Sequence, residues 1–287
     1  PVALYGFMNA TTLFPSIPLW WPLIIIIVGL ASAAFGALHA AVESDAKKLL
    51  AYSSIEHMGL LFSAAGVLVA LVSSTSHPII ETLQRGVLIF LFFHAANHFF
   101  FKTGLFMSIG AIMSETHTRD LDLMGGLARA WPAFSGVVLA LSLSAAALPP
   151  FGAFFGEWMY VQTLALALSF FSPLFALIAA AMLAMVALVA GLGLFASIKM
   201  FSAIFLGRPR TAHAEKMKPL PLTLVVPPAL CALLSLLSGF AVVPFIATHF
   251  SDSAVSFFSD LRILDATINA WYILAFLLLS AGAAYLF

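Results

Sequence analysis

The amino-acid sequence predicts an all-α fold, a polytopic membrane helix bundle of about seven spans after a partial N-terminal helix. Composition is the first observation behind this prediction: 63% of the 287 residues are hydrophobic and 8% are charged, and the mean hydropathy is +1.10. Soluble domains average roughly 45–50% apolar and about 25% charged residues. The second observation is the recurrence of apolar runs long enough to cross a bilayer, and the third is an alternation of basic and non-basic loops between them.

A spanning helix needs about 20 mostly apolar residues. The runs of that length are Leu19 to Val42, Leu49 to Val72, Val87 to Met113, Trp131 to Phe171, Leu174 to Leu206, Leu222 to Thr248 and Thr267 to Phe287. Residues 1–13 predict a partial helix before them. Residues 251–266 mix apolar pairs with charges at helical spacing, which predicts an interfacial amphipathic helix.

The run Trp131 to Phe171 is too long for one straight span. Its 41 residues would reach about 60 Å at about 1.5 Å each, twice the bilayer core of roughly 30 Å. Pro149 and Pro150 remove two amide donors, so we expect a discontinuous helix broken near 148–153, at these prolines and Gly152. Backbone freed by such a break must be buried in protein or line a wet cavity, as at transporter ion sites. A simple proline kink, or two separate short segments, is the alternative.

The loops fall into two sets. Loops 43–48, 114–130 and 207–219 carry Lys47, Lys48, Arg119, Arg129, Arg208, Arg210, Lys216 and Lys218, whereas the loops around 14–18, 73–80, 171–173 and 249–266 carry only Arg262. The positive-inside rule predicts that the basic loops are cytoplasmic. The regular alternation also supports the number of spans, because one missed helix would disturb it.

Charge and cysteine content exclude several classes of function. The 12 basic and 12 acidic side chains balance, so nothing in the charge indicates a nucleic-acid partner. The single cysteine, Cys231, cannot form an internal disulfide or a four-thiolate iron–sulfur site. We therefore expect no cofactor and no catalytic residue here, and any redox chemistry nearby must belong to another chain.

The strongest functional signal is the pattern of His94, His98 and Lys102, which lie at i, i+4 and i+8 within an apolar run. Charges at mid-membrane depth cost at least about 2.5–3.5 kcal/mol, so such groups usually face a hydrated interior and mark an ion or proton path. Imidazole can accept a proton on one nitrogen and release one from the other. Burial penalises the charged form of lysine and so favours proton exchange. Two histidines at i and i+4 also suit zinc, but the next residue at ligand spacing is a lysine, so we expect no metal.

Three further ionisable groups accompany this motif. Glu157 follows the predicted break by one to two turns and can load and unload a proton, or can pair with a lysine of a neighbouring helix. Glu56 and His57 lie about two turns beyond Lys47. Lys47, Glu56 and His57 form a proton uptake path; alternatively, Glu56 and His57 only make a polar contact between helices. The predicted order of transfer is uptake near Lys47, Glu56 and His57, then His94, His98 and Lys102, with release through Glu157.

Four segments resemble the antiporter-like subunits of respiratory complex I and its relatives. They are ESDAKKLLAYSSIEHMG (43–59), HAANHFFFK (94–102), TRDLDLMGGLARAWP (118–132) and ALPPFGAFFGEW (147–158). Within that superfamily the chain most resembles the hydrogenase-4 and formate hydrogenlyase branch. Ile55-Glu56 after the serines, the P-P-x-x-x-F-x-x-E-W pattern and the loop 207–215 carry this closer resemblance.

The resemblance implies an organisation and a function. Members contain two inverted five-helix repeats; this chain would supply the second over residues 19–206, after a partial helix and loop at 1–18 and before additional C-terminal helices at 207–287. The first repeat would then be provided by further sequence or another polypeptide. The resemblance also implies a central relay at His94, His98 and Lys102 and a terminal residue at Glu157. The chain would move protons in a bacterial or archaeal cell inner membrane, while partner subunits of an oxidoreductase complex transfer electrons.

Two other functions remain open from the sequence. One is a subunit of a multi-chain Na⁺/H⁺ antiporter or a bicarbonate-uptake complex without electron transfer. The other is a scaffold that anchors soluble enzymes and conducts nothing. The fold resemblance does not fix the transported ion.

Overall fold

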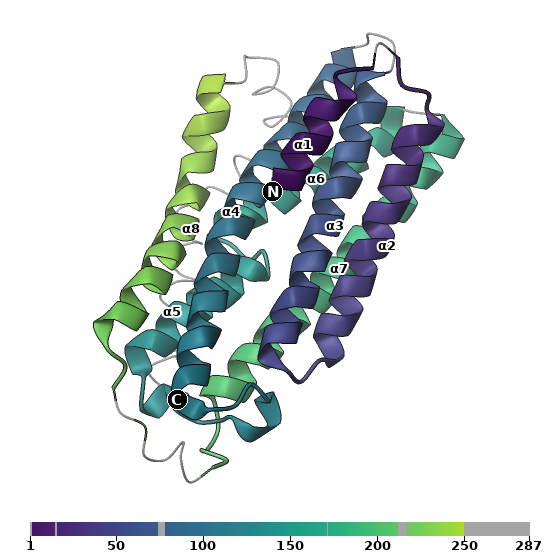
Figure 1. Cartoon of the computed structure of the whole chain (residues 1–287). Coiled ribbons are helices and arrows are strands. Elements are labelled where there is room, and N and C mark those ends of the chain that lie inside the picture. Colours follow the sequence, from purple (N-terminus) through teal and green to yellow (C-terminus); the bar gives the residue numbers. More distant parts are fainter. Residues whose placement is uncertain are drawn as a thin grey trace. The chain divides into compact units, whose positions relative to one another are not determined.

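The computed structural model describes residues 2–14, 16–73, 78–170, 172–211, 217 and 219–249. These residues form α-helices and two short 3-10 turns, at Leu121–Leu123 and Leu127–Arg129, and no β-strand. The helices are α1 (Val2–Thr11), α2 (Trp20–Val42), α3 (Ala46–Val72), α4 (Pro78–Thr116), α5 (Pro132–Ala145), α6 (Gly152–Phe170), α7 (Pro173–Phe205) and α8 (Leu222–His249) (Figure 1). The predicted all-α class is confirmed.

Five helices of the described part are long and apolar enough to cross a membrane: α2, α3, α4, α7 and the stretch Leu222–Ala241 of α8. The chain is therefore a multi-pass membrane helix bundle. The predicted span Thr267 to Phe287, the interfacial helix at 251–266 and Arg262 lie outside the described residues, so a total of seven spans stays a prediction. The chain divides into two compact units, residues 1–239 and 240–287, and all contacts below lie within the first. The predicted five-helix repeat over 19–206 is not tested by this division.

Two helices begin before their apolar runs. α3 begins at Ala46 because the carboxylate of Asp45 caps it, accepting hydrogen bonds from the backbone N–H groups of Lys47 (2.9 Å) and Lys48 (3.1 Å). α4 begins at Pro78, since proline suits the first turn of a helix. Glu81 and Arg85 form an i, i+4 ion pair in the same segment. Cap and turn chemistry, rather than hydropathy, sets these boundaries.

The helices α2 and α3 pack backbone against backbone. A Cβ atom on Gly29 would lie 2.5 Å from the backbone nitrogen of Ser63, one on Gly36 would collide with the backbone nitrogen of Glu56, and one on Gly59 with that of Ala33. Glycine is therefore required at all three positions of this antiparallel pair. Figure 1 shows the two helices side by side. These glycine contacts, the seam between α2 and α3, fix the position of α3 along the axis of α2.

The three predicted basic loops lie together at one end of this unit. Backbone hydrogen bonds join Ala46 N to Arg119 O (2.9 Å), Leu121 N to Ser44 O (2.9 Å) and Gly126 N to Leu206 O (2.9 Å). Gly126 has a φ of 68°, which favours glycine. We call this the basic-loop end. The sequence-based grouping of these loops is confirmed by their contacts.

Lys199 of α7 joins that helix to the end of α2. Its Nζ atom donates hydrogen bonds to the carbonyl oxygens of Ala40 (3.3 Å), Ala41 (2.7 Å) and Glu43 (2.7 Å). The last carbonyls of a helix have no partner within the helix, and a lysine can satisfy them. Lys199 therefore caps the C-terminus of α2.

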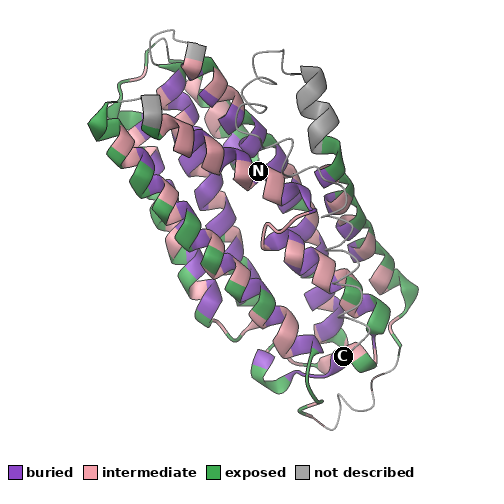
Figure 2. Cartoon of the chain, turned by 180° about the vertical axis from the view of Figure 1, so that it is seen from behind, coloured by how far each residue is buried: buried purple, intermediate pink, exposed green. Residues whose placement is uncertain are grey.

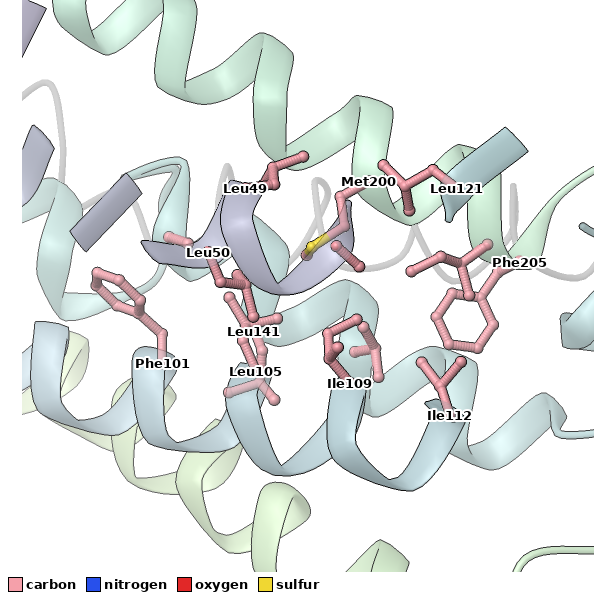
Figure 3. Packing of buried hydrophobic residues seen from close by; sticks show 14 of the residues in the cluster. Leu49, Leu50, Phe101, Leu105, Ile109, Ile112, Leu121, Leu141, Met200 and Phe205 are labelled. Carbon is pink, nitrogen blue, oxygen red and sulfur yellow. The ribbon is translucent and has the colours of Figure 1, made fainter. Parts of the chain in front are cut away.

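Apolar side chains pack into two clusters. The first lies toward the basic-loop end and is drawn in Figure 3, where Leu49, Leu50, Phe101, Leu105, Ile109, Ile112, Leu121, Leu141, Met200 and Phe205 are labelled. The second takes residues from the opposite halves of the same helices, including Leu60, Leu61, Leu83, Phe90 and Val186. Figure 2 shows buried residues on the inner faces of the helices and exposed residues on the outer faces. The polar residues described next lie between the two clusters along α3 and α4.

Candidate functional site

Buried polar side chains occupy the interval between the two apolar clusters. On α3 these are Glu56 and His57, which are 2% and 3% exposed; on α4 they are His94, Asn97, His98 and Lys102, which are 0–7% exposed. Glu157 of α6 has 13% of its side chain exposed. The predicted face of α4 is thus turned into the protein. Its three titratable groups share that face because residues four apart are neighbours on a helix.

The close approach of α4 and α6 sets which residues face each other. Gly152 of α6 lies against the side-chain amide of Asn97, and a Cβ atom on Gly156 would lie 3.1 Å from the backbone nitrogen of His94. One turn further, Phe90 stacks on Tyr160 with ring centroids 4.6 Å apart. This antiparallel register places Glu157, the neighbour of Gly156, beside His94.

His94 lies between an acid and a second imidazole. Its Nδ1 atom lies 3.5 Å from Oε1 of Glu157, within ion-pair distance, and its Nε2 atom lies 3.1 Å from Nδ1 of His57. The three side chains come from α6, α4 and α3. We call Glu157, His94 and His57 the His94 chain. Because its two contacts use opposite nitrogens of one ring, His94 can receive a proton on one side and donate one on the other.

His98 and Lys102 extend the polar layer toward the basic-loop end. The ring centroid of His98 lies 5.5 Å from that of His57. Both ring nitrogens of His98 are buried without a hydrogen-bond partner in the described part of the protein. Lys102 Nζ donates to the carbonyl oxygen of Leu50 (3.3 Å), and no described carboxylate lies within ion-pair distance of it.

Glu56 points away from His57, toward α7. Gly193 of α7 makes room for it, because a Cβ atom there would collide with Oε1 of Glu56. Its Oε2 atom is buried and has no hydrogen-bond partner among the described residues. Lys47, the third residue of the predicted uptake path, is exposed at the start of α3 and does not join the cluster. It lies nine residues before Glu56, about 13 Å along the helix.

The predicted break is confirmed. α5 ends at Ala145 and α6 begins at Gly152. Leu148, Pro149, Pro150 and Phe151 lie between them, and Ala147 has a φ of 47°. The two half-helices therefore replace one long helix, and Glu157 lies in the second turn of the second half.

The His94 chain also contains the side-chain types of a metal site. One ligand atom from each of His57, His94 and Glu157 lies within 4.8 Å of the others, and two histidines with one carboxylate form a known zinc set. His94 turns Nδ1 toward Glu157 and Nε2 toward His57. Contacts through both nitrogens of one ring suit a proton relay, and the absence of a metal stays a prediction from the sequence.

The sequence did not assign two features of the site. His57 was expected on an uptake path, but its direct contact with His94 depends on how α3 packs. Asn97 received no role, although an amide three residues after His94 in an apolar run was a usable signal. Its partners on α8, Ser235 and Ser238, gave no signal, because serine is common in membrane helices.

Comparisons with known proteins identify relatives of this chain. The family described as "NADH:quinone oxidoreductase/Mrp antiporter, TM" matches residues 1–185. Hydrogenase-4 component B of Escherichia coli is 36% identical over 231 residues, which cover 77% of this chain and 33% of the relative. Formate hydrogenlyase subunit 3 of the same organism is 30% identical over 241 residues, 84% of this chain and 39% of the relative.

Among solved structures, a chain of respiratory complex I from Thermus thermophilus superposes with a TM-score of 0.57 and 25% identity, over 76% of this chain and 40% of that chain. The chain spans about a third of the length of the curated relatives, 33% and 39%. The resemblance identified from the four sequence segments is confirmed. On these matches the chain belongs to the NADH:quinone oxidoreductase/Mrp antiporter transmembrane family.

Proposed function

We propose that this chain is the proton-translocating part of a membrane subunit in a respiratory-type oxidoreductase complex, of the hydrogenase-4, formate hydrogenlyase or NADH:quinone oxidoreductase kind. Electron transfer takes place in partner subunits and drives proton movement here. The observation that carries the proposal is the His94 chain, a buried contact series between Glu157, His94 and His57 that crosses three helices.

The order of the groups follows from the directions of the helices. α4 ends at the basic-loop end, so Lys102 lies nearest that end and His98 and His94 lie progressively further from it. Glu157 contacts His94 and lies on the half-helix that leads to the opposite end. The proposed route therefore runs from uptake near Lys47 and Glu56, past Lys102 and His98, through His57 and His94 to Glu157. It moves His57 from the uptake end, where the sequence placed it, to the side of His94. It differs from the order expected from the sequence in placing His94, not Lys102, next to the releasing acid.

Buried polar atoms along this route support hydration. Glu56 Oε2, His94 Nδ1 and both ring nitrogens of His98 are buried without a described hydrogen-bond partner. A buried polar group that makes no hydrogen bond costs roughly 1–3 kcal/mol in proteins, and ordered water usually satisfies it. Water in this layer would connect His98 and Lys102, which are not joined by a hydrogen bond in the described part of the protein.

The proposed setting follows from the family and the loops. The subunit would lie in the inner membrane of a bacterial or archaeal cell, with Lys47, Lys48, Arg119, Arg129, Arg208 and Arg210 on the cytoplasmic side. Its partners are the other membrane and peripheral subunits and the lipid bilayer. Protons are the transported ion.

The direct test uses the full-length subunit assembled in its complex and reconstituted in liposomes with an entrapped pH dye. Addition of the electron donor of the complex should change the internal pH, and a protonophore should abolish the change. A matched preparation with Glu157→Gln should transfer electrons but move few protons. Equal proton movement by both preparations would refute the proposed route.

The second candidate is a subunit of a multi-chain Na⁺/H⁺ antiporter or bicarbonate-uptake complex. It is favoured by the family itself, whose description joins oxidoreductase and Mrp antiporter subunits. In the same liposomes this function predicts proton movement driven by an imposed Na⁺ or bicarbonate gradient without any electron donor. A scaffold that conducts nothing predicts no internal pH change under either condition.

A further inference from the structure

A second buried polar cluster lies next to the helix break, on residues that the proposed route does not use. Its centre is Asn97 of α4, which is fully buried. Asn97 Oδ1 accepts a hydrogen bond from the hydroxyl of Ser235 (2.9 Å) on α8. The hydroxyl of Ser238, also on α8, shares its single proton between Asn97 Oδ1 (2.8 Å) and the carbonyl oxygen of Ser235 (2.7 Å). The Nδ2 atom of Asn97 donates to the carbonyl oxygen of Phe93 (2.9 Å). One amide thus ties α4 to α8 while staying anchored to its own helix.

The network continues to the end of α5. The hydroxyls of Ser144 and Ser235 lie 2.6 Å apart and are both fully buried. Because the single hydroxyl proton of Ser235 is given to Asn97, Ser144 must be the donor in this contact. The hydrogen bonds therefore run in one direction, from α5 through α8 to the amide on α4.

Residues of this cluster and of α8 pack tightly against the unwound backbone of the break and against the start of α6. A Cβ atom on Gly152, the first residue of α6, would collide with Nδ2 of Asn97 and the hydroxyl of Ser238. A Cβ atom on Gly239 of α8 would collide with the carbonyl oxygen of Pro150 and lie 3.1 Å from the backbone nitrogen of Gly152. α8 thus covers the unwound backbone at close range, and both half-helices end against one hydrogen-bonded cluster.

We infer that Asn97, with Ser235 and Ser238, is a positioning residue of the relay, which holds the start of α6 so that Glu157 stays in reach of His94. Asn97 lies about one turn from His94 on α4, and Gly152 lies five residues before Glu157 on α6. The contact of Asn97 with Gly152 and the contact of His94 with Gly156 therefore fix the two helices at consecutive turns. This inference rests on the proposed function for its effect on transport, but the position of Glu157 can be measured separately.

The variants that test it are Asn97→Ala and the double variant Ser235→Ala/Ser238→Ala, which removes both donors and leaves the amide in place. Ser108→Ala is the matched control, because Ser108 is also fully buried on α4 but its hydroxyl, within the described residues, bonds to Gly104 O of its own helix (2.8 Å). Two readouts are taken on the assembled complex. One is donor-driven proton translocation; the other is the infrared band of the Glu157 carboxyl group, assigned by its loss in Glu157→Gln and sensitive to its contact with His94.

We expect both test variants to shift the Glu157 band and to slow proton translocation on the order of tenfold or more, because a displacement of about 1 Å can cost a hundredfold in transfer. Ser108→Ala should change neither. An unshifted band in the test variants would overturn the inference, whatever happens to the rate. If Asn97→Ala fails to assemble, the double variant decides by the same criterion. A shifted band in a complex whose wild type moves no protons would uphold the positioning role and refute the proposed function.

Discussion

His94 and Glu157 approach to 3.5 Å across a contact between two helix backbones, because the residue beside the acid is Gly156. Any larger residue at 156 would hold α6 away from α4 at the point where the imidazole and the carboxyl group meet. The first prediction follows from this dependence.

Replacement of Gly156 by valine should slow proton translocation on the order of tenfold or more by lengthening the distance from His94 to Glu157. The new Cβ atom would already lie 3.1 Å from the backbone of His94 before the methyl groups are added, and overpacking of this kind costs about 1–3 kcal/mol. Gly110→Val is the control, since a Cβ atom on that residue of α4 meets nothing within 4 Å. Translocation rates are compared per assembled complex, and equal rates for the two variants would contradict the prediction.

His57→Phe should interrupt the His94 chain while keeping an aromatic ring of similar size in place. The variant loses the Nδ1 atom that lies 3.1 Å from Nε2 of His94, so we expect a large fall in proton translocation with normal assembly. His39→Phe is the matched control, because the hydrogen bond of His39 among the described residues goes to Phe35 O of its own helix (2.8 Å). A His57→Phe complex with the wild-type rate would remove His57 from the route.

Lys102→Met and Lys102→Arg should both abolish translocation. Together the two variants distinguish a role of the positive charge of Lys102 from a role in which Lys102 takes up and releases a proton. Methionine removes the ammonium group, whereas arginine keeps a positive charge that is never given up as a proton. Methionine fills a similar volume without the cost of burying a charge, so we expect the Lys102→Met complex to assemble. Lys48→Met, an exposed lysine of α3, is the control. Proton release at the wild-type rate by a correctly assembled Lys102→Arg complex would rule out proton exchange at this residue.

Lys199→Met should destabilise the subunit rather than alter the route. It removes three hydrogen bonds to the C-terminal carbonyls of α2, and leaving buried acceptors unpaired costs about 1–3 kcal/mol. We expect a lower thermal unfolding temperature, with translocation per folded complex close to the wild-type value. An unchanged unfolding temperature would show that water replaces the lysine at no cost.

Hydropathy and proline chemistry were sufficient to predict much of the fold. The runs that begin at Leu19, Leu174 and Leu222 correspond to α2, α7 and α8 within a residue, because apolar length is what a bilayer selects. The break at Pro149 and Pro150 followed from their missing amide donors. The starts of α3 and α4 were less predictable, since Asp45 acts as a cap and Pro78 begins a helix ahead of its apolar run.

The candidate site was predictable only along one helix. Spacing alone places His94, His98 and Lys102 on one face of α4, because that face is set by helical geometry. Which groups of α3 and α6 meet this face depends on backbone contacts at Gly36 and Gly156 and on the room that Gly193 leaves for the Glu56 side chain. A single sequence does not reveal which glycines touch which helix. The partners of Asn97 were hidden for the same reason.

The seam between α2 and α3 has a mechanical consequence. The backbones of α2 and α3 are in direct contact at Gly29, Gly36 and Gly59. No side chains lie between them there that could repack if one helix moved, so α2 and α3 should move together as a rigid body. Phe35 and Leu38, on the same α2 segment, are about half exposed, at 50% and 52%. A neighbouring subunit that pushed on this outer flank would displace Glu56 and His57 directly.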